Sequence, residues 1–148
     1  MSLPESRYLA QRLLAYEADA GKNSETSDSA TFRVCAKLRR PLITLAGVAG
    51  FRSLISRALM LARAEAPSLS AVHVAADGSL QGLDELEPQI GKDQAREGGA
   101  ILIAQLIALL LTFIGEGLTL CMVRDVWPEA AFDGRISEKK REKLEHSR

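Results

Sequence analysis

The chain has 148 residues, with 19 basic and 19 acidic side chains and 47% hydrophobic residues. A chain of this length can bury a core as one globular domain without disulfides or metal. Its zero formal net charge excludes general electrostatic adhesion to nucleic acid, which is not an expected partner. The two cysteines, Cys35 and Cys121, lack the CxxC spacing of metal and redox motifs. No metal or other cofactor is therefore expected, and the location is expected to be cytoplasmic.

The first 29 residues predict a helix followed by a polar linker. Leu9, Leu13 and Tyr16 recur at helical spacing. Residues 21–29 contain only small, polar and charged side chains, which bury too little apolar area to offset the cost of ordering them. We therefore expect residues 1–29 to precede the core domain as a tethered helix.

Residues 30–128 predict the core domain, beginning with a helix that Ser29 caps. Pro41 is expected to kink this helix, because proline lacks a backbone donor and clashes with the preceding turn. The apolar spacing then continues as far as Pro67. Gly47 and Gly50 lower the helix propensity of this stretch. We interpret them as a notch in the helix surface where another helix packs closely.

A small β-hairpin is predicted near residues 70–81, because Asp77-Gly78 is a dipeptide favoured in tight turns. A polar, acidic connection over 82–97 follows, and then one long apolar helix from Gly98 to Val126. The predicted fold is mainly α: a helical bundle with a Pro-kinked helix pair, a long apolar central helix and the hairpin as an insertion. Residues 129–148 are expected to form a charged tail, either a solvated helix or disordered.

The long apolar helix approaches the length needed to cross a membrane. Its polar residues, however, fall on one narrow stripe of the helix, which lipid would not require and which a soluble bundle explains. These residues are Gly98, Gln105, Thr112, Glu116 and Thr119. We favour the soluble interpretation and keep a membrane-associated subunit, anchored by residues 98–123, as the alternative.

Basic residues are concentrated in one part of the chain. Residues 30–66 carry seven basic side chains and one acidic one, whereas residues 67–97 carry two basic and six acidic ones. Arg33, Lys37 and Arg40 share one helix face and are candidate contacts to a partner. The other interpretation is that the basic residues of 30–66 and the acidic residues of 67–97 neutralise each other, within the fold or across a dimer.

Groups that support catalysis are few, so no catalytic residue is assigned. Glu116 is the one carboxylate whose position in the predicted apolar helix requires a partner if it is buried, and Arg52 or Arg57 is the natural candidate. Arg52 and Glu116 are therefore further candidate contacts to a partner or ligand. A third function, a small-ligand or catalytic domain, would use Glu116, Arg52 and His73.

The function favoured by this sequence is a non-enzymatic interaction, regulatory or assembly module that acts through protein–protein contacts. A large apolar helix surface combined with few catalytic groups is typical of such modules. The expected partner is another protein or a second copy of the chain. Closed homodimers are the commonest solution, and here the helices of 42–66 and 98–124 would form the interface.

Overall fold

The structure is a computed structural model that describes residues 3–21 and 29–128. It confirms the mainly α bundle with a long apolar helix and a two-stranded antiparallel hairpin. The predicted linker falls largely in residues 22–28 and the predicted tail in residues 129–148, so both lie outside the described residues.

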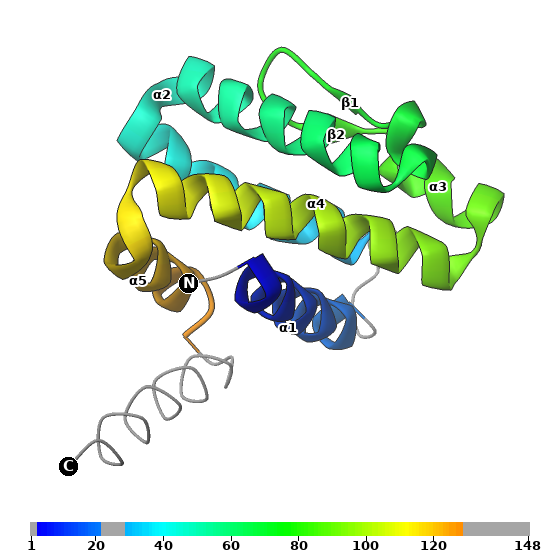
Figure 1. The fold of residues 1–148 in the computed structure, drawn as a ribbon, viewed down its shortest axis with the longest axis horizontal. Helices are drawn as coiled ribbons and strands as arrows, with labels where there is room; N and C mark the ends of the chain where they lie inside the picture. Colours follow the sequence, from blue (N-terminus) through cyan, green and yellow to red (C-terminus); the bar gives the residue numbers. More distant parts are fainter. Residues whose placement is uncertain (1–2, 22–28, 129–148) are drawn as a thin grey trace.

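Helix α4 (Lys92–Phe113) is the centre of the bundle. Figure 1 shows it between α1 (Leu3–Gly21) and the two halves of α2 (Ala30–Glu65). The middle of α4 is enclosed by these neighbours: its buried apolar residues are Ala100, Ile101, Leu102, Ile103, Ala104, Leu106, Ile107 and Leu110. From α1, Leu9 and Leu13 are fully buried in the same core, so α1 is part of the packed bundle.

Helix α2 begins where the sequence predicts but bends at a different residue. The Ser29 side chain accepts a hydrogen bond from the backbone N–H of Phe32 at 3.1 Å, as expected of an N-cap. The chain remains helical through Pro41, where Leu38 and Leu42 on either side are buried in the core. The non-helical residue is Gly47, with φ 78° and ψ 170°.

The predicted notch at Gly47 and Gly50 is wrong. A Cβ at Gly47 would meet nothing within 4 Å, and one at Gly50 would meet only Ala46 of the same helix. The close approach of helices lies instead at Gly99 of α4, where a Cβ would clash with the Thr31 side chain of α2. Gly47 therefore bends the helix and does not make room for a neighbouring one. Its backbone angles are accessible essentially only to glycine.

The hairpin is confirmed where it was predicted. Helix α2 ends at Glu65, a 3₁₀ turn η1 (Pro67–Ala71) follows, and β1 (His73–Val74) pairs antiparallel with β2 (Leu80–Gln81). The connecting turn is closed by Asp77, whose side chain accepts from the Ser79 N–H at 3.0 Å and from its hydroxyl at 2.7 Å. Gly78 takes a positive φ of 88° in this turn.

Two predicted features of the second half are wrong. The expected acidic connection contains helix α3 (Leu83–Ile90), and α4 already begins at Lys92. The expected single helix to Val126 is broken at Gly115, whose φ is 86°, into α4 and α5 (Gly115–Val126). The break ends the predicted polar stripe, since Thr112 before it is exposed and Thr119 after it is buried.

Candidate interaction surface

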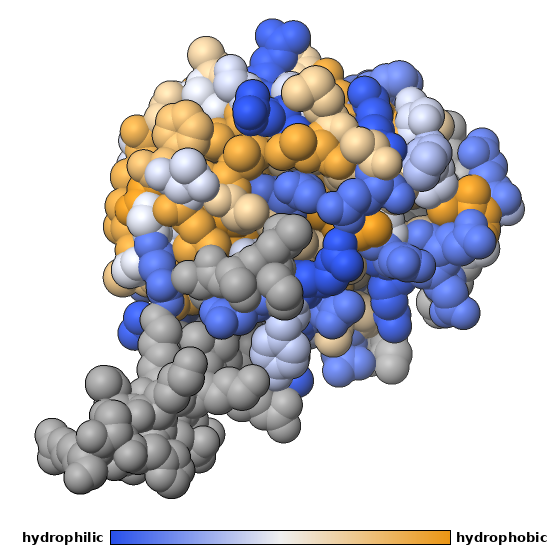
Figure 2. Space-filling model, viewed as in Figure 1, coloured by the Kyte–Doolittle hydropathy of each residue, from blue (hydrophilic) through white to orange (hydrophobic). Residues whose placement is uncertain are grey.

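The bend of α2 and the break between α4 and α5 lie at the same end of the molecule (Figure 1). Four large apolar side chains are exposed at these two turns: Leu45 (52%), Val48 (45%), Phe113 (72%) and Leu118 (46%). We call these four residues the apolar end surface. Figure 2 shows hydrophobic residues gathered over this end of the molecule. Exposed apolar residues that cluster in this way mark a contact surface more often than scattered ones do.

Glycine conformation creates this end surface. Gly47 and Gly115 both adopt positive φ, and a Cβ at either would point into open space. Neither glycine is therefore required for close packing; each serves to turn the chain. All six residues from Thr44 to Ala49 are exposed as a result.

Three exposed arginines lie on α2, two of them close to its bend. Arg40 precedes the exposed segment by one turn, Arg52 follows it by one turn, and Arg57 lies further along the second half of the helix. The eleven residues from Pro41 to Phe51 contain no charged side chain. Within the described parts of the chain, no ion pair engages these three arginines.

Arg33 and Lys37, which were predicted to contact a partner, meet a carboxylate of the same chain. Glu17 of α1 is 1% exposed; it forms an ion pair with Lys37 and lies 3.6 Å from the Nε of Arg33. Arg33 also donates to the Glu17 backbone carbonyl at 2.5 Å. The indole N–H of Trp127 donates to the Glu17 carboxylate at 3.2 Å. This cluster joins α1, α2 and the end of α5.

The predicted pairing of Glu116 with Arg52 or Arg57 is wrong. Among the residues described, neither arginine pairs with Glu116, and both are exposed. Glu116 is half-buried in the first turn of α5 and has an interaction of its own. The break at Gly115 places it in a new helix rather than along the buried line of α4.

A catalytic site built from Glu116, Arg52 and His73 is not formed. His73 is exposed on β1, which lies on the far side of α2 from α5 (Figure 1). Within residues 3–21 and 29–128, no group of three or more His, Cys, Asp or Glu side chains is placed to hold a metal ion. Burial raises the pKa of the Cys35 thiol to about 12, whereas Cys121 is exposed on α5.

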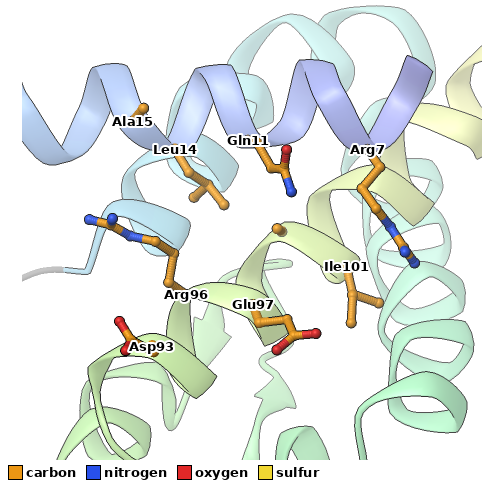
Figure 3. Close-up of a pocket in the computed structure, with 9 residues that line it drawn as sticks. Arg7, Gln11, Leu14, Ala15, Asp93, Arg96, Glu97 and Ile101 are labelled. Atoms are coloured by element: carbon orange, nitrogen blue, oxygen red, sulfur yellow. The ribbon is translucent and has the colours of Figure 1, made fainter. Parts of the chain in front are cut away.

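A shallow hollow of about 460 Å³ lies between α1 and the first turns of α4 (Figure 3). Its polar side chains come from both helices and are all exposed: Arg7, Gln11, Asp93, Arg96 and Glu97. Two cations and two carboxylates balance in charge there, and Arg7 is already paired with Glu65 at 2.7 Å. The hollow therefore offers no desolvated group that would select a ligand.

Two stretches are long and apolar enough to cross a membrane, Ala30–Glu65 and Asp93–Val126. The most apolar window of the first is only 33% buried, and that of the second is 56% buried. A spanning helix needs about 20 consecutive apolar residues in a continuous helix. The bend at Gly47 interrupts the first stretch and the break at Gly115 interrupts the second.

Comparison of the chain with protein-family models, with curated proteins and with solved structures finds no match.

Sequence reasoning identified neither the apolar end surface nor Glu17. The uncharged run between Arg40 and Arg52 marks the first of these, because a helix of a soluble bundle normally has polar residues on its outer face. The signal for Glu17 is its spacing: Leu9, Leu13 and Glu17 recur every four residues, so the carboxylate continues the buried stripe of α1.

Proposed function

We propose that the protein is a non-enzymatic interaction module that docks through its apolar end surface. The observation that carries this proposal is the exposure of Leu45, Val48, Phe113 and Leu118 at one end of the bundle. Water contact with side chains of this size is unfavourable by about 25 cal/mol for each Å² of apolar area. Covering them on a partner surface recovers that free energy.

The test compares the full chain with two double variants in the cells that make it. Phe113→Ser with Leu118→Ser removes apolar area from the end surface. Met60→Ser with Tyr8→Ser removes exposed apolar side chains elsewhere, because these residues are also large and exposed. Circular dichroism of the purified variants verifies that each one folds.

We expect the wild type and the Met60/Tyr8 variant to sediment from native lysate in an assembly or with membranes. The Phe113/Leu118 variant is expected to sediment as the free chain. If all three proteins sediment alike, docking through this surface is wrong.

Self-association is the second candidate, since the exposed apolar side chains lie on the helices expected to form a homodimer. Sedimentation equilibrium of the purified chain tests it directly. A mass that rises to twice 16.0 kDa with concentration, and that falls in the Phe113/Leu118 variant, would support a dimer through the end surface.

A further inference from the structure

We infer that the occupant of the apolar end surface is the surface of an anionic lipid bilayer. This inference rests on the proposed docking function and names the partner. The two turns of the chain insert their apolar side chains below the headgroups, and Arg40, Arg52 and Arg57 contact the phosphates. The bundle itself stays outside the hydrocarbon region.

The shape of the apolar end surface suits a bilayer. Its apolar side chains come from the residues around two turns, at Gly47 and Gly115, and not from one continuous helix. Projecting apolar turns fit a medium that adapts to them. Interfacial segments bury their apolar side by about 5–10 Å at the headgroup boundary, which is the depth of one or two helical turns.

Four of the seven cations of α2 contact groups within the chain. Arg33 and Lys37 contact Glu17, Arg39 lies beside Asp77, and Arg63 donates to backbone carbonyls of Leu69 and Val72. The arginines of α2 left exposed are Arg40 and Arg52, which flank the uncharged segment, and Arg57 further along the helix. Long basic side chains can lie along apolar surface while their charged ends reach the headgroup level. Each cation near an anionic membrane adds to the attraction.

A second copy of the chain fits this end less well than anionic lipid does. A two-fold dimer through this end would place the same patch of each copy against its equivalent. The Arg40 and Arg52 of one copy would then approach those of the other, and like charges across an interface are unfavourable. The acidic side chains of α5 are Glu116, which has its own interaction, and Asp125 in its last turn. Anionic lipid supplies the complementary charge.

The experiment measures binding of the purified full chain to vesicles by flotation. Vesicles of phosphatidylcholine alone are compared with vesicles containing about one-third phosphatidylglycerol. A fluorophore on Cys121 reports the environment of α5, because this thiol is exposed and lies one turn from Leu118, whereas Cys35 is buried. We expect flotation and a blue shift with the anionic vesicles, and much weaker binding to the neutral ones.

Three double variants, two of them matched arginine pairs, separate charge from apolar contact. Arg40→Gln with Arg52→Gln is expected to lower the partition coefficient about 25-fold, at about fivefold for each arginine near the anionic surface. Arg12→Gln with Arg96→Gln removes the same charge from α1 and the first turns of α4, and is expected to change partitioning less than threefold, a small effect on the same scale. Phe113→Ser with Leu118→Ser is expected to abolish the blue shift.

The inference is overturned if the wild type does not float with anionic vesicles, or if the two arginine pairs lower binding equally. In the first case, loss of sedimentation in the Phe113/Leu118 variant in cells would still support docking, with a protein as the partner. If the cell fractionation also shows no difference, the proposed function fails together with the lipid inference.

Discussion

Glu17 is a carboxylate almost completely removed from water, and it depends on three partners from distant parts of the sequence. Arg33 and Lys37 come from α2, and Trp127 follows α5. Removal of one partner of a buried ion pair leaves the remaining charge uncompensated, which is more costly than the loss of an exposed pair. This cluster is therefore the site at which a single polar substitution should affect stability most.

Glu17→Ala is expected to lower the free energy of unfolding by about 3 kcal/mol or more, because it removes the nearly buried carboxylate that pairs with both Arg33 and Lys37. Urea unfolding followed by circular dichroism measures the loss. Glu65→Ala is the control: it removes an exposed ion pair to Arg7 and is expected to cost at most about 1 kcal/mol. Equal losses in the two variants would contradict the importance of burial here.

The two cysteines are expected to differ in reactivity. Burial opposes formation of the charged thiolate, so the raised pKa of Cys35, about 12, keeps it protonated at neutral and mildly alkaline pH. Cys121 is exposed. Iodoacetamide at pH 8 should therefore modify one residue per native chain, and peptide mass mapping should place it at Cys121. Rapid modification of Cys35 before unfolding would contradict the burial.

Residue-level prediction from the sequence succeeded where the determining interactions are local. Ser29 caps a helix through the N–H three residues later, and Asp77 closes a turn through Ser79. It failed for the role of Glu17, whose three side-chain partners lie 16, 20 and 110 residues away in sequence. Helical spacing shows that Glu17 faces the core but does not show what neutralises it.

At the scale of elements, glycine decides where the two long apolar segments turn. Gly47 replaces the expected kink at Pro41, and Gly115 divides the expected long helix. The helix-propensity cost of a glycine is the same whether it lies at a notch or at a bend, so sequence alone could not distinguish the two. Packing distinguishes them: Gly99 faces Thr31, whereas Gly47 and Gly115 face open space.

Gly47→Ala is expected to destabilise the fold by about 1–3 kcal/mol, because residues other than glycine are strained at its φ of 78° and ψ of 170°. Gly117→Ala is the matched control. A Cβ at Gly117 meets nothing within 4 Å inside helix α5, so the better helix propensity of alanine should stabilise by up to about 1 kcal/mol. Thermal unfolding monitored by circular dichroism compares the two; a stabilising Gly47→Ala would show that the bend is not required.

At the scale of the whole molecule, the position of α4 explains why such an apolar segment does not imply a membrane-crossing chain. The residues from Ala100 to Ala104 are all buried against neighbouring elements. Insertion of α4 across a bilayer would require α1 and both halves of α2 to leave it. The proposed docking of the two turns on a membrane surface would leave this core intact.

The same packing predicts that the described bundle unfolds as one cooperative unit. Trp127 is the single tryptophan of the chain and is 1% exposed, and its indole contacts Glu17 of α1. Its fluorescence therefore reports the contact between α1 and the end of α5, whereas far-ultraviolet circular dichroism reports all helices together. Because α1, α2 and α4 share one core, the two signals should follow the same urea transition. A tryptophan red shift complete at lower urea than the loss of helix would show that the contact between α1 and the end of α5 opens before the rest of the bundle, which would contradict a single cooperative unit.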